Sequence, residues 1–450
     1  MNIVITILTF IIILCTIVII HEGGHAIVAR LCGVRVTEFF VGMPWGPTLA
    51  KKSRRSGITY GFTLALLGGY TRIAGMGATG VTHDPRLSCV LAYTNRLGTV
   101  TVGMVAQDLE YSDEVTKQLL DTLCDWGSLE PVDALVRGKT SKLTTTYRTV
   151  PRDANGLTIR DRHHSKEQFA FTRAGDAFIP PIDDDLFFEQ ERHFTYVGVG
   201  YLKRVAIVLA GIFFNLVFAL IACMLYFMLH GVPYIPSQIA EVDPLSEANA
   251  VGMLAGDEIT AINGTAVNGY SEVSQALKNA HGTEQAQIDF IRNGETHTVY
   301  ANLTNDTFGI MYQREQYHYS ISEAFEVSVS IGVETAIQVA SLLIPSRTAE
   351  VISNSSGIVG VATVTSQAAM TGIWEVMLLW ALLSLSIALV NLLPFLPLDG
   401  GHFVIETIQA VIGHPISDTA KGMYALVGIA LLVLLFIVLL FQDISRILPF

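Results

Sequence analysis

The sequence carries little charge for its length. Only 15% of its 450 residues are Asp, Glu, Lys or Arg, whereas soluble proteins carry about a quarter. Hydrophobic residues make up 51% of the chain, and they gather in long runs without any charge. This balance excludes an ordinary soluble globular protein and predicts a membrane protein with soluble parts.

Cysteines and clustered basic residues are scarce as well. The five cysteines are odd in number and form no C-x-x-C pair, which argues against a disulfide framework and favours reduced thiols. The net charge is −12, and no long basic stripe exists. Because nucleic-acid binding depends on Lys and Arg side chains that face phosphates, we expect no nucleic-acid partner.

Four segments are long and apolar enough to cross a bilayer, which takes about 20 residues. We expect these membrane helices at 1–33, 203–230, 374–399 and 423–442. The first lacks the basic start and the small-x-small cleavage site of a signal peptide, so we expect it to be retained. A further apolar stretch at 319–345 is interrupted by Glu326 and Glu334, which favours an amphipathic helix over a fifth span.

The basic residues predict the orientation of these helices. They follow the first helix and precede the second: Arg30, Arg35, Lys51, Lys52, Arg54, Arg55, Lys203 and Arg204. By the positive-inside rule both ends of the intervening segment are cytoplasmic, so the region after Leu229 lies outside. With the first helix crossing inward, the second outward and the third inward again, Asp399 emerges on the same face of the membrane as His21.

Residues 82–199 form a cytoplasmic insertion in which we find no motif. The histidines within it lie among charges without paired spacing, so we interpret them as surface residues: His163, His164 and His193. Short motif matches mislead too often to assign them as metal ligands.

Residues 236–305 are expected to form a β-rich module outside the membrane. Asn263-Gly264 predicts a tight turn, and Asn293-Gly294 predicts a hairpin between two alternating strands. The run from Gly256 to Gly264 resembles the G-D-x-I-x-x-I-N-G signature of bacterial PDZ domains. Such domains bind extended peptides along a sheet edge.

The stretch "HEGGH", residues 21–25, predicts metal chemistry. His21 and His25 are four residues apart, so on a helix they share one face at the spacing that lets two imidazoles bind one Zn²⁺ ion. Glu22 is not at ligand spacing and suits a general base. Ionisable residues at membrane depth are costly and usually functional, which strengthens this interpretation.

Asp399 is the expected third ligand. A hydrolytic zinc site takes three protein ligands and leaves a position for water. Pro394 and Pro397 break the preceding helix just before Asp399, and unwound backbone at membrane depth is found where it is buried or lines a wet cavity.

These motifs together resemble the site-2 protease family of intramembrane zinc metalloproteases, most closely the bacterial regulator-of-sigma-E proteases. The resemblance lies in "HEGGH" at the end of the first helix, the PDZ-like module, and "NLLPFLPLDGG" after a later helix. It implies an α-helical polytopic membrane protein with four transmembrane helices, a membrane-reentrant β-hairpin at 57–76 and an extracytoplasmic PDZ domain. The cytoplasmic insertion at 82–199 is longer than the usual connection in that family, and its role is open.

The resemblance also implies substrates and further site residues. Asn391 matches an asparagine that holds substrate near the metal in that family, and the hairpin is expected to offer a strand edge to an unwound substrate through Thr63, Leu64, Ala65, Leu66 and Leu67. Implied substrates are single-pass membrane proteins already trimmed outside, such as anti-sigma factors, or remnant signal peptides. The implied location is the bacterial inner membrane.

Two small features carry two interpretations each. Gly23 and Gly24 leave room either for an incoming peptide backbone or for a closely packed neighbouring helix. Asn215 stands at an asparagine position of the family, and a hydrogen bond between helices is the alternative reason for it.

Two other functions use the same features. A membrane metal transporter would use intramembrane ligands as a transit site, and a non-catalytic scaffold would bind peptide tails through the PDZ module. We see no inverted repeat and no second ligand cluster for transport. Glu22 favours catalysis, because neither alternative needs an acid beside the histidines.

Overall fold

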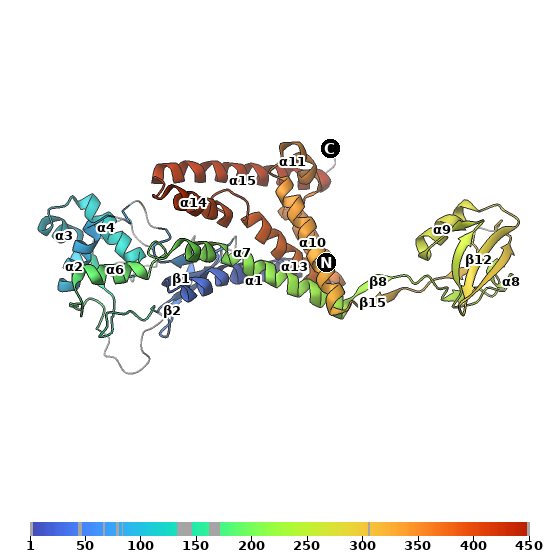
Figure 1. Ribbon diagram of the computed structural model, residues 1–450, viewed down its shortest axis with the longest axis horizontal. Helices are drawn as coiled ribbons and strands as arrows, with labels where there is room; N and C mark the ends of the chain where they lie inside the picture. Colours follow the sequence, from blue (N-terminus) through green and yellow to red (C-terminus); the bar gives the residue numbers. More distant parts are fainter. Residues whose placement is uncertain are drawn as a thin grey trace. The chain divides into compact units, whose positions relative to one another are not determined.

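The computed structural model describes most of the chain. Its described residues are 3–43, 47–65, 68–77, 81–82, 84–132, 146–161, 172–304 and 307–447. They divide into two compact units: unit 1 comprises Met1–Cys223 with Ser328–Phe450, and unit 2 comprises Met224–Val327. Unit 1 holds the apolar helices and the insertion, and unit 2 holds the β-rich module (Figure 1).

Four long apolar helices form the membrane part. They are α1 (Ile3–Leu31), α7 (Tyr201–Leu225, continued by the π-helical turn η1, Tyr226–His230), α13 (Ile373–Asn391) and α15 (Asp418–Ile447). Each has the length and composition to cross a membrane, so the four predicted segments are confirmed as candidate spans. Of the described helices, α10 (Ile321–Ser341) is not a further candidate span, in keeping with the three glutamates within it.

The third span ends earlier than its predicted limit. Helix α13 stops at Asn391, and Pro394 and Pro397 follow, which lack the N–H group that a continuing helix needs. A separate helix, α14 (Asp399–Ile412), then begins. Asp399 therefore lies in the first turn of a new helix rather than at the end of the span.

Two helices that the sequence did not predict, α11 (Pro345–Asn354) and α12 (Ile358–Thr371), precede α13. Helix α12 is too short to span a bilayer and packs among α1, α13 and α15. Asp443 of α15 caps its first turn, because the carboxylate accepts the N–H groups of Gly357 and Gly360 at 3.1 and 2.9 Å.

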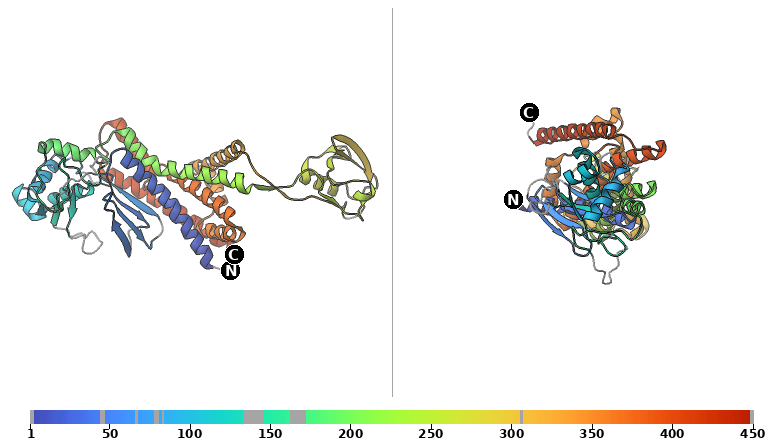
Figure 2. Two further views of the ribbon diagram at one scale, coloured as in Figure 1. Left: turned by 90° about the horizontal axis from the view of Figure 1, so that it is seen from below. Right: turned by 90° about the vertical axis from the view of Figure 1, so that its left-hand side faces the viewer.

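A four-stranded sheet follows α1 along the chain. Its strands are β1 (Val36–Val41), β2 (Thr48–Lys52), β3 (Thr59–Thr63) and β4 (Gly69–Ile73), in the order β2-β3-β1-β4. Figure 2 shows the sheet between α1 and the insertion. The predicted hairpin at 57–76 is wrong in its pairing, because β1 lies between β3 and β4 and is parallel to β3. The residues of the turn between β3 and β4 cannot reveal that β1, from an earlier part of the chain, lies between these two strands.

The insertion is a folded domain with its own core around Trp126, Leu119 and Leu120. Its elements are α2 (Arg86–Leu97), β5 (Thr99–Thr101), α3 (Val102–Asp108), α4 (Asp113–Asp125), β6 (Leu129–Pro131), β7 (Thr146–Thr149) and α6 (Asp184–His193). Residues 109–112 join α3 to α4 as in a helix-turn-helix, and the three strands pair in the order β5-β7-β6. The described elements of the insertion thus combine a helix-turn-helix with a three-stranded sheet.

Helix α4 holds the place of the recognition helix of that motif. Ser112 caps it by accepting the N–H group of Val115, and its exposed side chains include Asp113, Glu114 and Asp121. DNA-binding helices of this kind present Lys and Arg to phosphates. The acidic surface of α4 is therefore unsuited to nucleic acid.

A buried ionic cluster joins the insertion to the end of α1. Arg35 lies 2.5 Å from Asp161 and 2.8 Å from Glu191, and Glu191 also pairs with Arg152 at 2.8 Å. All four side chains are fully buried. Burial by itself would raise the pKa of Glu191, but the guanidinium groups of Arg152 and Arg35 outweigh it and hold that pKa well below its usual range.

Unit 2 contains a four-stranded sheet in the order β11-β10-β12-β13. Its elements are β8 (Val232–Tyr234), β9 (Glu241–Val242), α8 (Glu247–Ala250), β10 (Glu258–Ile262), β11 (Thr265–Ala266), α9 (Gly269–Asn279), β12 (Ala286–Arg292), β13 (Glu295–Ala301), β14 (Ile310–Met311) and β15 (Glu315–Tyr317). The predicted Asn-Gly turns are confirmed, because Asn263 and Asn293 have φ values of +49° and +51°. The module runs past residue 305, since β14 pairs with β9 and β15 pairs with β8.

We predict that Glu191→Gln destabilises the insertion, because it leaves two buried guanidinium groups without their shared carboxylate. Removing one partner of a buried pair costs about 3–5 kcal/mol. The folded pKa of Glu191 lies below its unfolded value of about 4.3, so its contribution is present above that pH and is lost as the pH falls towards the folded value. Limited proteolysis of the full chain in detergent, at neutral pH and at about pH 3–4, measures both effects.

The matched control is Glu189→Gln on the same helix. Glu189 pairs with Arg192 at 3.4 Å but is 61% exposed, and exposed pairs contribute about 0–1 kcal/mol. Equal loss of stability in the two variants would show that the buried cluster does not hold the insertion in place.

Candidate metal centre

Helix α1 presents two imidazoles in its C-terminal part. His21 and His25 are one turn apart and project from the same face, with their rings 4.9 Å apart and nearly perpendicular. Their Nε2 atoms are 3.3 Å apart. The spacing in "HEGGH" therefore has the structural consequence that the sequence predicts.

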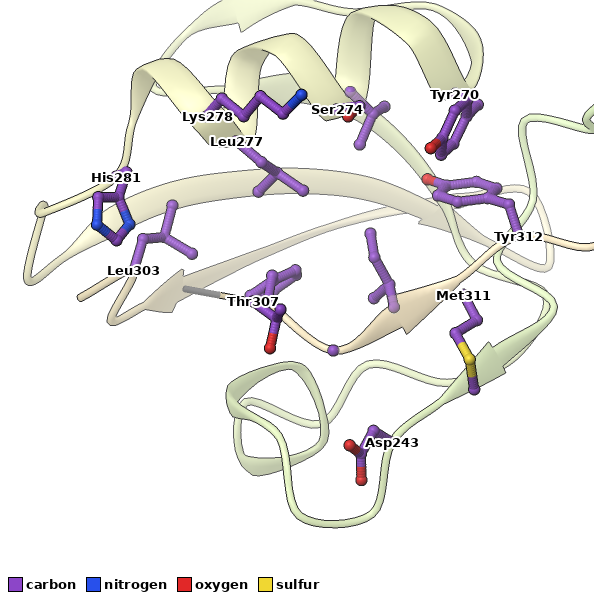
Figure 3. A pocket seen from close by; sticks show the side chains of 14 residues that line it. Asp243, Tyr270, Ser274, Leu277, Lys278, His281, Leu303, Thr307, Met311 and Tyr312 are labelled. Carbon is purple, nitrogen blue, oxygen red and sulfur yellow. The ribbon is translucent and has the colours of Figure 1, made fainter. Parts of the chain in front are cut away.

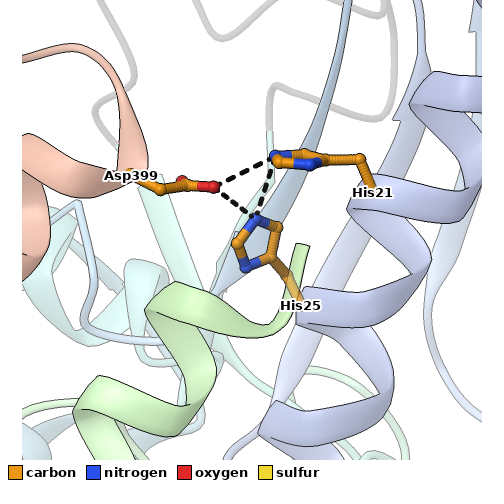
Figure 4. A group of neighbouring side chains, drawn as sticks. All are labelled: His21, His25 and Asp399. Carbon is orange, nitrogen blue, oxygen red and sulfur yellow. Dashed lines mark hydrogen bonds and ion pairs between the residues drawn. The ribbon is translucent and has the colours of Figure 1, made fainter. Parts of the chain in front are cut away.

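Asp399 meets both imidazoles from the start of α14 (Figure 4). Its Oδ2 atom lies 3.1 Å from Nε2 of His21 and 3.4 Å from Nε2 of His25. The two glycines after it let the first turn of α14 lie against the preceding chain. A Cβ atom on Gly400 would meet the carbonyl oxygen of Leu392 at 2.3 Å, and one on Gly401 would meet the backbone nitrogen of Leu396 at 2.4 Å.

The three atoms fit a zinc ion. Within the described chain, His21, His25 and Asp399 are the group of three side chains that can share a metal. A tetrahedral Zn²⁺ ion with bonds of about 2.0–2.1 Å sets its ligand atoms about 3.3 Å apart, close to the separations given above. Oδ2 of Asp399 is buried at ion-pair distance from both rings, yet it accepts no well-aligned hydrogen bond from any described residue. The two Nε2 atoms and Oδ2 of Asp399 therefore surround a common point, as ligands of one metal ion do, and are not arranged as a hydrogen-bonded group.

Helix α7 closes one side of the site. Nδ1 of His25 lies 2.8 Å from the carbonyl oxygen of Ile207, the kind of acceptor that fixes the tautomer of a metal-bound imidazole. A Cβ atom on Gly211 would lie 2.4 Å from Nε2 of His25 and 2.8 Å from Nε2 of His21. Gly211 was missed in the sequence, where a glycine within an apolar helix is the signal of a close approach.

Gly23 and Gly24 have different surroundings. A Cβ atom on Gly24 would meet the carbonyl oxygen of Ala210 at 2.8 Å, so Gly24 allows α1 and α7 to pack closely. A Cβ atom on Gly23 would meet nothing within 4 Å. Helix packing accounts for Gly24 alone, and open space lies beside Gly23.

Glu22 lies on α1 against β4. Its backbone oxygen accepts a hydrogen bond from the hydroxyl group of Thr71 at 3.0 Å, and a Cβ atom on Gly69 would lie 3.3 Å from its Cγ atom. Its side chain is only partly buried and is not one of the three converging groups. Strand β4 is thus the strand of the sheet that contacts the acid of the "HEGGH" motif.

The predicted strand edge at Thr63 to Leu67 is wrong for the residues that the structure describes. Thr63 ends the interior strand β3, pairs with Thr48 of β2 and donates its hydroxyl group to the carbonyl oxygen of Met43 at 2.6 Å. The carbonyl oxygen of Ala65 accepts the N–H group of Met43. Leu64 is 72% exposed, and Leu66 and Leu67 lie outside the described residues. The edges of the sheet belong to β2 and β4.

Asn391 lies at the last turn of α13, before the proline segment that leads to Asp399. Its Nδ2 atom donates to the carbonyl oxygen of Ile387 at 3.0 Å, within the same helix. The structure thus places Asn391 near the end of the span, with its side-chain amide hydrogen-bonded to the backbone of its own helix.

Comparison with known proteins covers almost the whole chain. The model of peptidase family M50 matches residues 9–435. A zinc metalloprotease RasP from Geobacillus kaustophilus is 27% identical over 98% of both chains. The regulator of sigma-W protease RasP from Bacillus subtilis is 24% identical over 98% of both chains. A probable protease eep from Enterococcus faecalis is 25% identical over 98% of this chain and 99% of its own.

We predict that Gly211→Ala removes the metal. The added methyl group would occupy the space beside both Nε2 atoms, so the imidazoles could not keep their converging geometry. Elemental analysis of the protein purified in detergent should find zinc in the wild type and little in the variant. Gly23→Ala is the matched control, because it adds the same methyl group to open space and should keep its zinc. Full occupancy in Gly211→Ala would contradict this account of α7.

Proposed function

This chain belongs to peptidase family M50, and from that premise we propose that it cleaves single-pass membrane proteins whose outer domains have already been trimmed. It is a zinc-dependent intramembrane metalloendopeptidase. Anti-sigma factors and remnant signal peptides are the proposed substrates, and the bacterial inner membrane is the proposed location. Family membership sets aside the alternatives of a metal transporter and a non-catalytic scaffold.

The convergence of His21, His25 and Asp399 at the end of a membrane helix carries this proposal. From Ile3 to His21, α1 rises about 27 Å, and this length supports our proposal that the metal ligands lie near the cytoplasmic edge of a hydrocarbon core about 30 Å thick. Zinc bound there supplies Lewis-acid activation of water and of the scissile carbonyl group. Glu22 takes the proton from the attacking water and passes it to the leaving amide nitrogen.

We propose that β4 receives the substrate as an added strand. A peptide bond in a helix is shielded by its own hydrogen bonds, so the substrate must unwind before cleavage, and an exposed sheet edge can bind the extended segment. Strand β4 has one free edge and contacts α1 at Glu22. The open space beside Gly23 leaves room for the substrate backbone. Asn391 is proposed to hold substrate as in the family.

The sheet is proposed to enter the membrane from the cytoplasmic side. Side chains at the distal ends of β2 and β3 are apolar and exposed, among them Leu49, Phe62 and Leu64. At the other end of the same strands lie Lys51, Lys52, Arg54 and Arg55. An apolar tip with a basic base suits a sheet that dips into the bilayer from its anionic inner face.

We propose that unit 2 is a PDZ domain on the outer side that filters substrates by size. Its groove lies between α9 and the segment Thr307–Tyr312, with Lys278 and His281 towards one end and Tyr270 towards the other (Figure 3). A groove beside a strand suits an extended peptide. A folded obstacle outside would admit trimmed substrates and hold back bulky ones.

We predict that Glu22→Gln abolishes cleavage while zinc remains. General acid–base groups contribute about 10²- to 10⁴-fold to rate, and Glu22 does not belong to the ligand group. The measurement is cleavage of a tagged panel of single-pass helices by purified protein, alongside elemental analysis. The matched control is Glu334→Gln on α10, an exposed glutamate of a membrane-associated helix, which should cleave at the wild-type rate. Undiminished cleavage by Glu22→Gln would remove Glu22 from the chemistry.

The filter is tested by excising the module at its base. Strands β8 and β15 pair antiparallel with Tyr234 opposite Glu315, so an Asn-Gly turn can replace residues 235–314 and close them as a hairpin. We predict that the shortened protease still cuts a helix with a short outer tail and newly cuts the same helix with a folded outer domain. Adding Glu22→Gln should abolish both activities. Loss of short-tail cleavage on excision would instead make the module a docking site or a structural support.

A further inference from the structure

Asn215 lies fully buried on α7, with its side chain against His21. Its Nδ2 atom is 3.4 Å from Nδ1 of His21, and its Oδ1 atom is buried without a hydrogen-bond partner among the residues that the structure describes. Leaving an amide oxygen unpaired in the interior is unfavourable. In this orientation Nδ2 of Asn215 has a partner, whereas Oδ1 still needs a hydrogen-bond donor.

The metal centre dictates what His21 needs from that neighbour. Nε2 of His21 points at Asp399, so it is the atom that would bind the metal, and a neutral imidazole that offers Nε2 carries its proton on Nδ1. That N–H group needs an acceptor. His25 already has one, the carbonyl oxygen of Ile207, whereas His21 faces an amide.

The two ends of an amide have the same shape, and their hydrogen-bond partners decide which end is oxygen. With Oδ1 turned towards His21, Oδ1 gains a donor and Nδ1–H gains an acceptor, and Nδ2 takes the buried position that Oδ1 held. We propose that Asn215 is a positioning residue that holds His21 in the Nδ1–H tautomer with Nε2 facing the metal. This inference rests on the metal centre of the proposed function. Helix α7 would then supply the outer hydrogen-bond partner of both imidazoles.

The alternative role, a hydrogen bond between helices, is already met by the backbone. Ser384 of α13 donates its hydroxyl group to the carbonyl oxygen of Asn215 at 3.1 Å. That contact needs no amide side chain. In the described part of the chain, the amide itself makes its hydrogen bond to His21.

The experiment measures zinc affinity of the full chain in detergent by competition with a chromophoric chelator, together with the visible spectrum of the Co²⁺-substituted protein. Asn215→Leu keeps a similar volume without an acceptor, and its zinc affinity should fall about 10- to 100-fold with an altered Co²⁺ spectrum. Asn215→Asp offers a carboxylate oxygen to the same N–H group and should restore affinity. Ser384→Ala removes the contact between helices and should leave affinity and spectrum unchanged.

Wild-type zinc affinity in Asn215→Leu would overturn the inference. So would equal losses in Asn215→Leu and Asn215→Asp, provided both variants unfold at the wild-type temperature, because a purely structural role would not be rescued by an acceptor. His21→Ala separates the two proposals. If the wild type binds zinc no better than His21→Ala, the metal centre itself fails, whereas retained affinity in Asn215→Leu alone leaves that centre intact.

Discussion

The convergence of one carboxylate and two imidazoles at membrane depth is the constraint on which unit 1 depends. An ionised side chain such as Asp399 is costly there unless it is paired or binds a metal. It meets His21 and His25 only because α13 ends at Asn391 and a new helix begins at Asp399. The broken segment between these helices is therefore a requirement of the site.

Close approach of backbones is the second requirement, and glycine meets it at each contact. Gly24 lets α7 approach α1, Gly211 leaves space beside the two imidazoles, and Gly400 lets the start of α14 lie on the preceding chain. A methyl group at any of these positions would meet another atom at less than 3 Å. Each glycine lowers helix stability by about 1 kcal/mol relative to alanine. The close approaches at the site require glycine in spite of this loss.

Specific polar contacts attach the insertion to the rest of unit 1. The insertion is joined to the end of α1 by Arg35, whose guanidinium group pairs with Asp161 and Glu191 inside the protein. It is also joined to the end of β4, where Asp125 of α4 accepts the N–H group of Gly75 at 3.0 Å. Both contacts fall on elements that border the metal centre. The insertion therefore makes direct contacts with the elements that form the site and is not merely connected to them along the chain.

Local patterns in the sequence were sufficient for the features that depend on local physics. Apolar length predicted the four spans, Asn-Gly pairs predicted two turns, and the spacing of His21 and His25 predicted their shared helix face. Tertiary structure alone decided the rest, since strand pairing and helix packing join residues far apart along the chain. It placed β1 between β3 and β4, gave the insertion its own core of helices and strands, and set Gly211 beside the imidazoles. None of these contacts has a counterpart in neighbouring residues, so only the folded chain reveals them.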